Sequence, residues 1–420
     1  MMLPVSLRED LDTFIRNRLF LNSFILPDYE LFNIKNISSI VRDLFAIKSE
    51  LNTSFPKDYV ADYNGVEKVL LVILDGFGYT RLLSHTQRFN GVFSSFIEKG
   101  VSKFLTSPFP ATTSTSLTSI FTGLPPSKHG VIGFTTFLKE YGLIFNTLNM
   151  RAIYGNTPYI DIAEELSNKL TPWTATLTEN GIEVISLTRS SIVGSGLSKI
   201  IHKGQRIVPY ILQSDMFIQC RKILQKQTPL FLTMYYGGID SVEHLYGPES
   251  EETSREIQLL EGQLKSQLLD KLPEEDKKKT LIIVTADHGV VEATRTYFLK
   301  DIPDINDKLL LPPVGDSRAT FLFPKYGNVE ELKDALKKNI EGFTIISSKT
   351  LIEKGALGPT QDINLLKTGL GELAALSTNK NIIAYPHYSE DRKNLMAGAH
   401  GGMTPGEIIV PLLTAKLSKL

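Results

Sequence analysis

Short apolar runs recur along the chain, and amphipathic stretches separate them. The strongest runs occupy residues 69–74, 230–236 and 281–285, and weaker ones occupy 182–187 and 408–413. Runs of this length without polar interruption are typical of strands that are buried on both faces of a sheet. Between them, residues 255–272 place isoleucine and leucine at helical spacing. Strands that alternate with helices predict an α/β fold in which helices flank a mainly parallel sheet.

The same pattern divides the chain into segments. Residues 1–65 show helical periodicity without a strong strand run, which predicts a helical N-terminal extension. Residues 66–290 and 396–420 contain the strand runs and are predicted to form the α/β core. Residues 291–395 have proline-rich turns and weaker strand signals, so we expect an inserted cap or edge subdomain there.

Composition narrows the possible functions. The formal net charge is −1, so no global field attracts nucleic acid or an anionic membrane. The single cysteine, Cys220, excludes an internal disulfide, fits a reducing compartment and is expected to be a packed thiol. No apolar run approaches the ~20 residues of a membrane-spanning helix, and charged side chains interrupt the N-terminal stretch where a signal peptide would be apolar. We therefore expect a cytoplasmic protein.

Three of the predicted strands end beside an aspartate. Asp75 follows the first, Asp240 follows the second with His244 one helical turn later, and Asp287 follows the third beside His288. Open α/β sheets bind their ligands at the carboxyl ends of strands. A single aspartate there is commonly part of a turn or a helix cap. Three of them, two accompanied by a histidine, favour a site for divalent metals of the zinc type.

Residues 107–130 predict a helix whose first turn is rich in hydroxyl groups. Pro108 and Pro110 favour an extended lead-in, and Gly123 is suited to end the helix. One interpretation is an ordinary capped helix. The other is that the N–H groups at the helix start bind a phosphoryl oxygen, while Thr113 is a nucleophile that a metal activates. The metal-binding pattern at the strand ends favours the second interpretation.

The order of these motifs resembles that of the alkaline phosphatase superfamily. The chain reads VILDGFG at residues 72–78, then Thr113 ahead of a Thr-Gly pair, then DxxxH, ADHG and a late AHGG. Within the superfamily it is most similar to the type I phosphodiesterase/nucleotide pyrophosphatase family, over residues 66–290 and 396–413. The resemblance implies an alkaline-phosphatase-like α/β fold around a catalytic core.

The resemblance also implies a role for each matching residue. Thr113 corresponds to the nucleophile, and Thr112 is the alternative if the register shifts by one. The implied ligands of the metal that activates the threonine are Asp75, Thr113, Asp287 and His288. Those of the second metal are Asp240, His244 and His400. Mixed histidine and aspartate ligands favour zinc, with manganese as the alternative.

The chain departs from the family where the substrate would bind. The family's asparagine that steadies a phosphoryl oxygen falls here at Gly133 or Phe134, so this contact is missing or comes from elsewhere. Asn146 and Asn149 are either substitutes or ordinary polar residues. Arg318 either supplies a cation to the substrate or is a surface arginine. Aromatic side chains that either stack on a base or pack in the protein are Tyr79, Phe134, Tyr154 and Tyr159.

Together these features imply a two-metal phosphodiesterase or nucleotide pyrophosphatase that hydrolyses phosphodiester or phosphoanhydride bonds through a covalent phospho-threonine. Two divalent ions and three aspartates leave roughly one net positive charge, which balances a diester monoanion better than a monoester dianion. The expected partner is a small phosphorylated substrate, a nucleotide or a related diester, without membrane or specific nucleic-acid binding. The alternatives are a phosphomonoesterase or phosphonate hydrolase with the same site and, in another class, a non-catalytic metal- or nucleotide-binding protein.

Overall fold

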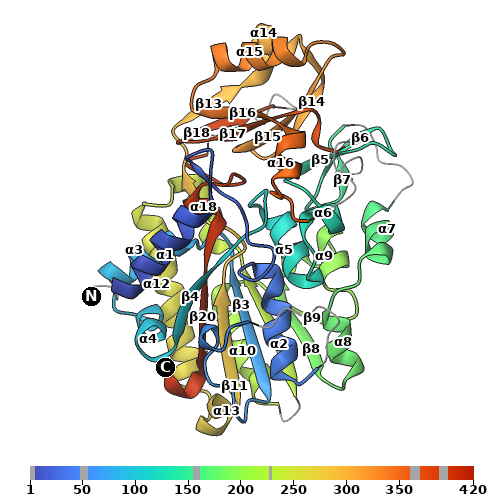
Figure 1. Ribbon diagram of the computed structural model, residues 1–420. Helices are drawn as coiled ribbons and strands as arrows, with labels where there is room; N and C mark the ends of the chain where they lie inside the picture. The colour runs from blue at the N-terminus through green and yellow to red at the C-terminus, as the bar shows by residue number, and fades with distance from the viewer. Residues whose placement is uncertain (1–4, 48–54, 155–160, 227–228, 360–368, 387–395) are drawn as a thin grey trace.

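The computed structural model describes residues 5–47, 55–154, 161–226, 229–359, 369–386 and 396–420. Within these residues the chain forms two seven-stranded sheets and three two-stranded ones. Figure 1 shows the main sheet below, flanked by helices, and the second sheet above it. The predicted α/β class is confirmed.

The main sheet has the strand order β4-β20-β11-β3-β10-β8-β9. Its strands are β3 (Lys68–Leu74), β4 (Val101–Thr106), β8 (Glu183–Arg189), β9 (Arg206–Tyr210), β10 (Leu230–Tyr236), β11 (Thr280–Thr285) and β20 (Ile409–Lys416). Strand β3 pairs in parallel with β10 and β11, and β8 pairs in parallel with β10 and β9. Strand β20 runs antiparallel to both β4 and β11. The sheet is therefore mainly parallel, as predicted.

Every apolar run of the sequence is a strand of this sheet, and every residue of β3 and β11 is buried. The sequence did not predict β4 and β9, which are the two edge strands. An edge strand has a neighbour on one side only, so its composition is less apolar and even tolerates Pro209. Apolar runs in the sequence therefore predict the central strands but not the two edge strands.

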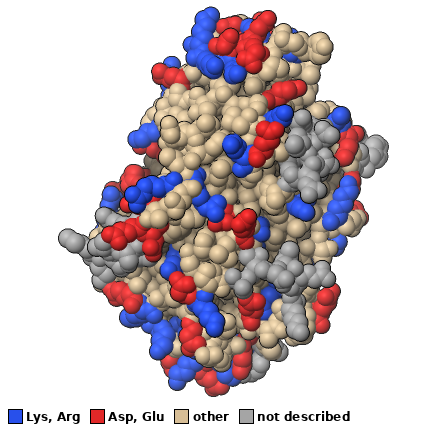
Figure 2. Space-filling model, viewed as in Figure 1, with Lys and Arg blue, Asp and Glu red and all other residues tan. Residues whose placement is uncertain are grey.

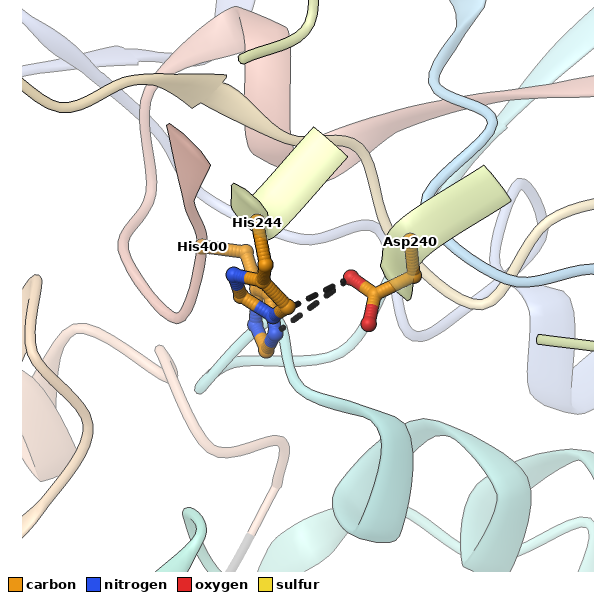
Figure 3. Close-up of side chains that lie close together, drawn as sticks. All are labelled: Asp240, His244 and His400. Carbon is orange, nitrogen blue, oxygen red and sulfur yellow. Dashed lines mark ion pairs between the residues drawn. The ribbon is translucent and has the colours of Figure 1, made fainter. Parts of the chain in front are cut away.

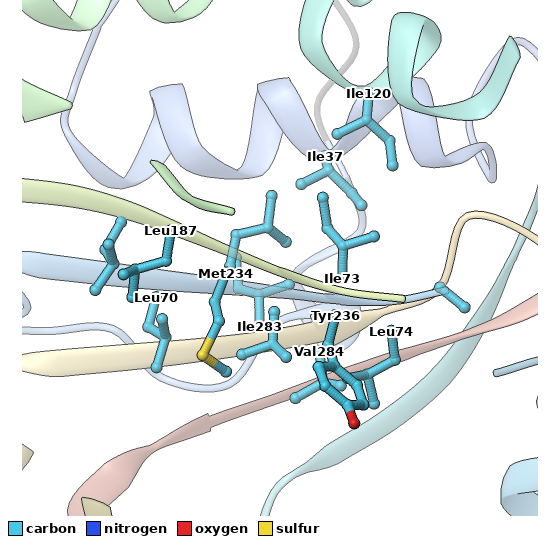
Figure 4. Packing of buried hydrophobic residues seen from close by; sticks show 14 of the residues in the cluster. Ile37, Leu70, Ile73, Leu74, Ile120, Leu187, Met234, Tyr236, Ile283 and Val284 are labelled. Carbon is cyan, nitrogen blue, oxygen red and sulfur yellow. The ribbon is translucent and has the colours of Figure 1, made fainter. Parts of the chain in front are cut away.

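Helices cover both faces of the main sheet (Figure 1). They include α2 (Ile37–Leu44), α3 (Tyr79–Arg88), α4 (Val92–Lys99), α5 (Thr113–Thr122), α10 (Gln213–Leu224), α11 (Gly238–Tyr246) and α12 (Glu251–Gln263). In Figure 4, Ile37 of α2 and Ile120 of α5 lie over Ile73 of β3, and all three belong to one buried cluster. Cys220 is also buried in this cluster, so the predicted packed thiol is confirmed.

Further helices lie elsewhere in the described residues. They are α6 (Pro126–His129), α7 (Ile162–Lys169), α8 (Thr174–Glu179), α9 (Gly196–Ile201), α13 (Glu274–Lys278), α14 (Pro303–Asn306), α15 (Val329–Asn339), α16 (Ser348–Glu353) and α18 (Pro405–Ile408). The helix predicted over residues 255–272 corresponds to α12 and the π-helical turns Leu264–Leu269 that continue it.

The second sheet has the order β16-β17-β15-β14-β5-β6-β7. Its strands are β5 (Thr135–Leu138), β6 (Leu143–Asn146), β7 (Arg151–Ala152), β14 (Leu309–Gly315), β15 (Ala319–Pro324), β16 (Phe343–Ser347) and β17 (Leu373–Ser377). Four of these strands lie in the range predicted for a cap, and three come from the range predicted for the core. A single pairing, Gly315 with Thr135, joins the two sets. The division of the chain into three segments stays a prediction.

The N-terminal residues connect the two sheets. Helix α1 (Val5–Arg18) leads into a hairpin of β1 (Leu19–Phe20) and β2 (Phe24–Ile25). Phe24 and Ile25 are fully buried and pack in the same cluster as Phe321 of the second sheet. The remaining strand pairs are β12 (Val291–Glu292) with β19 (Gly398–Ala399) and β13 (Arg295–Phe298) with β18 (Asn381–Ala384).

Charged side chains of both signs are interspersed over the face seen in Figure 2, in keeping with a formal net charge of −1. No helix within the described ranges combines the length and the apolarity needed to cross a bilayer. Attraction of a phosphorylated molecule therefore depends on a local site rather than on the whole surface.

Candidate functional site

The residues singled out in the sequence meet at the carboxyl edge of the main sheet. Asp75 follows β3, Asp287 and His288 follow β11, and Asp240 and His244 lie on α11 just after β10. Thr113 begins α5, and His400 follows β19. Parallel pairing of β3 with β10 and β11 brings the three strand ends to one edge. Elements far apart in sequence therefore contribute side chains to a single place.

The first group consists of Asp240, His244 and His400 (Figure 3). The Oδ1 atom of Asp240 lies 3.3 Å from Nε2 of His244 and 3.8 Å from Nε2 of His400. Asp240 and His244 face the same way because α11 separates them by one turn, as the four-residue spacing predicted. Three ligand atoms of this kind within 4.8 Å of one another can hold one metal ion.

Hydrogen bonds on the far side of both imidazoles fix their tautomers. Nδ1 of His244 lies 2.8 Å from the Gly398 carbonyl oxygen, and Nδ1 of His400 lies 3.0 Å from the Ala111 carbonyl oxygen. A carbonyl oxygen only accepts, so each Nδ1 carries the proton and donates it. Each Nε2 then presents its lone pair to the group, which is the arrangement that metal-bound histidines show.

The second group consists of Asp75, Asp240 and His288, so Asp240 belongs to both groups. Nε2 of His288 lies 3.3 Å from Oδ1 of Asp75 and 3.5 Å from Oδ2 of Asp287. The backbone N–H groups of Gly76 and His288 donate to the other oxygen of Asp287, at 3.2 and 3.0 Å, and leave Oδ2 free for a ligand role. The rings of His288 and His400 stack with centroids 3.8 Å apart, which joins the two groups.

The carboxylates of the site lack compensating positive charge. Among the described residues, Oδ1 of Asp75, Oδ1 of Asp240 and Oδ2 of Asp287 are buried without a hydrogen-bond partner. Burial, reinforced by the charge of Asp75, raises the pKa of Asp240 to about 7. Burial also raises the pKa of Asp287 to about 7 and, together with the charge of Asp287, holds the pKa of Asp75 well above its usual range. Divalent cations would supply the missing charge, so the donor set fits them.

Two histidines of the site, His288 and His400, are neutral at physiological pH. Burial lowers the pKa of His288 to about 3. Burial, together with the neighbouring His288 and His244, holds the pKa of His400 well below its usual range. Neutral imidazole is the form that binds a metal, so these shifts agree with the fixed tautomers.

Thr113 lies at the start of α5 beside the second group. Its Oγ1 atom is 3.2 Å from Nε2 of His288, and its hydroxyl also hydrogen-bonds to Asp75. The helix's own hydrogen bonding begins with the N–H of Ser116, which donates to the Thr112 carbonyl at 2.9 Å. The N–H groups of the preceding turn therefore have no acceptor within the helix, and they can bind an anion. Thr112, the alternative nucleophile, instead hydrogen-bonds to Asp316.

The structure contradicts both interpretations of Arg318. It is neither a surface residue nor available to a substrate, because its side chain is 1% exposed. Its guanidinium donates to Glu407 at 2.8 and 3.2 Å and to the Asn379 carbonyl at 2.6 Å. A buried ion pair of this kind holds β15 against the segment that precedes β20, so Arg318 is a structural residue.

The two asparagines considered as phosphate contacts are turn residues. Oδ1 of Asn146 accepts the N–H groups of Leu148 and Asn149, and Oδ1 of Asn149 accepts that of Arg151. These local bonds occupy the amide oxygens. The side-chain oxygens of both asparagines therefore accept hydrogen bonds within their own loop.

A cavity of about 400 Å³ opens from the candidate site toward the second sheet. Asp240, His244, His400 and Thr113 line one end of it, and apolar side chains including Val314 line the other. Phe134 lines this cavity and is 44% exposed, whereas Tyr79 is buried against Phe104 and is a core residue. Tyr154 is 37% exposed and does not line this cavity. Tyr159 lies outside the described residues.

The sequence did not single out two other residues of the site. The Tyr235 hydroxyl donates to Oδ2 of Asp75, and the Asp316 carboxylate lines the cavity beside Thr112. Tyr235 sits in an apolar run five positions before Asp240, so its spacing offered a weak signal. Asp316 follows a proline-rich strand of the second sheet and gave no signal, because only tertiary packing brings it to the site.

Comparisons with known proteins show which family this chain resembles. A family model described as type I phosphodiesterase/nucleotide pyrophosphatase matches residues 69–401. Ectonucleotide pyrophosphatase/phosphodiesterase family member 3 of Rattus norvegicus is 26% identical over 216 residues, which are 49% of this chain and 23% of that protein. The match thus spans less than a quarter of that relative's length.

Solved structures share the fold. Murine ectonucleotide pyrophosphatase/phosphodiesterase 5 has a TM-score of 0.61 at 20% identity, over 82% of this chain and 87% of that one. Its inactive variant in complex with AMP matches with the same TM-score of 0.61 at 19% identity, over 82% and 87%. Phosphonoacetate hydrolase from Sinorhizobium meliloti 1021, in complex with phosphonoformate, has a TM-score of 0.61 at 18% identity, over 84% and 91%.

Proposed function

The chain belongs to the type I phosphodiesterase/nucleotide pyrophosphatase family, whose members hydrolyse phosphoesters, and we propose that it does so through a covalent phospho-threonine on Thr113. The observation that carries the proposal is the position of the Thr113 hydroxyl, 3.2 Å from His288 at a helix start that faces both metal-ligand groups. The proposed substrate is a small phosphorylated molecule, a nucleotide or a related diester.

The proposed cofactor is a pair of divalent ions. One ion would be held by Asp75, Asp287 and His288 together with Thr113, and the other by Asp240, His244 and His400. Two observations support these sets, namely the unpartnered carboxylate oxygens and the histidine tautomers that leave Nε2 free. When bound, the ions lower the pKa of the threonine hydroxyl and offset the charge on the phosphoryl oxygens. We propose zinc for both positions because the ligands are mixed nitrogen and oxygen donors.

The residues of the chain then have separate tasks. The N–H groups of the first turn of α5 hold a phosphoryl oxygen next to Thr113. Oγ1 of Thr113, once its proton has passed to solvent, forms a bond to phosphorus while the bond from phosphorus to the leaving oxygen breaks and the leaving group departs with the electron pair. A water molecule next attacks phosphorus, the bond to Oγ1 breaks, and one proton of that water restores the Thr113 hydroxyl. Asp75 orients the hydroxyl through the hydrogen bond that Thr113 donates to it.

A substrate screen separates the proposed activity from its alternatives. Purified protein loaded with zinc would be assayed on bis-p-nitrophenyl phosphate, p-nitrophenyl phosphate, nucleotide sugars, dinucleotides and phosphonoacetate. We expect hydrolysis of diesters at the highest kcat/KM. A preference for the monoester or the phosphonate would instead support one of the alternative hydrolases. Metal binding without turnover of any substrate would support a non-catalytic binding protein.

The nucleophile is tested by two neighbouring variants. We expect Thr113→Ala to lower kcat by roughly 10³-fold or more, because removal of a nucleophile abolishes the covalent route. Thr112→Ala is expected to retain far more activity. Acid quenching during turnover followed by peptide mass spectrometry should find the phosphoryl group on Thr113. Turnover by Thr113→Ala at the wild-type rate, or label on Thr112, would show that the assignment is wrong.

A further inference from the structure

Asp316 is a fixed acidic residue in the wall of the cavity. It follows β14, and a tight turn holds its backbone, since its N–H donates to the Ala319 carbonyl at 3.0 Å. The hydroxyl of Thr320 donates to its carbonyl oxygen at 2.8 Å. The side chain is partly exposed and lines the same cavity as Thr113. The carboxylate is thus presented to the space where the substrate would lie.

Contacts from three other segments hold the carboxylate in place. Its Oδ2 atom accepts the N–H of Phe134 at 3.1 Å, and the Thr112 hydroxyl also hydrogen-bonds to it. A Cβ atom at Gly133 would lie 3.3 Å from Oδ2, and a Cβ atom at Gly401 would lie 2.3 Å from the Cβ of Asp316. The two glycines leave the space that the aspartate fills. The carboxylate therefore closes the wall between the start of α5 and the loop that carries His400.

No described lysine or arginine lines this cavity. The nearest arginine in sequence, Arg318, is already paired with Glu407. Burial and the charge of Glu407 raise the pKa of Asp316 to about 7, whereas the hydrogen bonds from Phe134 and Thr112 favour its ionised form. Cations in the neighbouring ligand groups would favour that form further. Above about pH 7, Asp316 therefore adds negative charge to a cavity in which no described basic side chain offsets it.

Away from the ligand groups and a few hydroxyl side chains, the cavity wall is largely apolar. Beyond Asp316 its wall contains Phe134, Leu148, Ile153, Val314, Ile383 and Met396. A neutral ester group can pack against these side chains and bury apolar surface. A second ionised oxygen, a carboxylate or a further phosphate would face the aspartate and lose its water.

We propose that Asp316 is a specificity-determining residue, which selects phosphodiesters with an uncharged group on the cavity side and rejects substrates with further negative charge there. The inference rests on the proposed phosphoesterase function and narrows its substrate class. Monoester dianions, phosphonocarboxylates and substrates with additional phosphates on that side belong to the rejected class. At a separation of several ångströms, repulsion between two unit charges is worth roughly tenfold in binding.

The test uses two substrates with the same leaving group. Methyl p-nitrophenyl phosphate is a monoanion, and p-nitrophenyl phosphate is a dianion at neutral pH. Asp316→Asn removes the charge and keeps the shape and the acceptor for Phe134. We expect it to raise the monoester-to-diester ratio of kcat/KM by roughly tenfold, mainly through KM. Asp334→Asn, at an exposed acidic position on α15, is the matched control and should leave the ratio unchanged.

A binding measurement covers the case in which Asp316→Asn does not fold. Zinc-loaded Thr113→Ala would be titrated calorimetrically with phenylphosphonate and with its monomethyl ester, neither of which is turned over. We expect the monoanionic ester to bind roughly tenfold more tightly. Equal affinities, or an unchanged kcat/KM ratio in a folded Asp316→Asn protein, would overturn the inference and leave the proposed function standing. If the wild-type protein hydrolysed neither of the two p-nitrophenyl substrates, both the inference and the proposed function would be overturned.

Discussion

The hydroxyl of Tyr235 donates a hydrogen bond to Oδ2 of Asp75. Burial and the charge of Asp75 hold the pKa of Tyr235 well above its usual range, so the phenol remains a donor. The other oxygen of Asp75 is left without a hydrogen-bond partner among the described residues. The tyrosine therefore fixes which oxygen faces His288, and Tyr235 is a positioning residue for the metal-ligand group.

Removal of this hydrogen bond should weaken metal binding without unfolding the protein. Tyr235→Phe keeps the ring and leaves Asp75 free to rotate, so we expect zinc affinity to fall by about 10- to 100-fold. Competition with a chromophoric chelator measures the zinc affinity of each protein. Tyr210→Phe is the matched control, because its hydroxyl donates at 2.7 Å to the Tyr235 carbonyl rather than to a carboxylate. Equal zinc affinity in Tyr235→Phe and wild type would contradict the positioning role.

The metal-free protein should lose stability as the pH rises through about 7. The folded pKa values of Asp240 and Asp287 are about 7, above the ordinary value of 3.8, so the folded protein keeps protons that the unfolded chain has released. Stability that these protons provide is lost as the pH rises through the folded pKa. Histidines with lowered pKa values, such as His288 at about 3, oppose this trend only near pH 6.5, where the unfolded imidazole is still partly protonated. Above about pH 7.5 they are neutral in both states.

Thermal denaturation of chelator-treated protein at pH 6.5, 7.25 and 8 checks this expectation. Zinc displaces the protons, so the increase in Tm on adding zinc should be larger at pH 8 than at pH 6.5. A metal-free Tm that rises over this range would show that the carboxylates are already ionised in the folded protein.

Arg318 should affect stability rather than substrate binding. Arg318→Ala leaves the buried Glu407 without its partner, which typically costs about 3–5 kcal/mol of unfolding free energy. The double variant Arg318→Met/Glu407→Gln removes both charges, keeps a hydrogen-bonding partner for Gly402 and Thr404, and should recover part of this loss. Urea denaturation of the three proteins gives the values. A stable Arg318→Ala protein with a raised KM would instead restore the interpretation of Arg318 as a substrate contact.

Gly289 should be the least replaceable residue of the ADHG motif outside the ligands. A Cβ atom there would lie 2.1 Å from the Gly406 carbonyl oxygen and 3.0 Å from the Cα of Gly78. We expect Gly289→Ala to lower the unfolding free energy by about 3 kcal/mol, since two backbone segments would have to move. Gly262→Ala is the control, because Gly262 lies in α12 and a Cβ atom there would have no other atom within 4 Å. This variant should raise the unfolding free energy by about 0.5–1 kcal/mol. Denaturant midpoints that move in the same direction would refute this contrast.

Much of the candidate site was accessible to sequence analysis because its residues sit at strand ends and helix starts. The apolar runs before Asp75, Asp240 and Asp287 identify central strands, and parallel strands end at one edge. The spacing of Asp240 and His244 needs only one helical turn. His400 follows no such rule and was found through the family resemblance alone.

What the sequence determined by itself is therefore the set of central strands, two of the helices beside them, α5 and α12, and the chemical character of the site. The second sheet, the sharing of Asp240 between two groups, the orientation of Asp75 by Tyr235 and the pairing of Arg318 with Glu407 were decided only by the tertiary structure. The physical reason is range. Periodicity reports how a residue sits in its own helix or strand, whereas the partner of a buried polar group lies far away in sequence, as with Arg318 and Glu407 at a separation of 89 residues. The packing of whole helices and strands determines which partners meet, and local sequence patterns do not predict this packing.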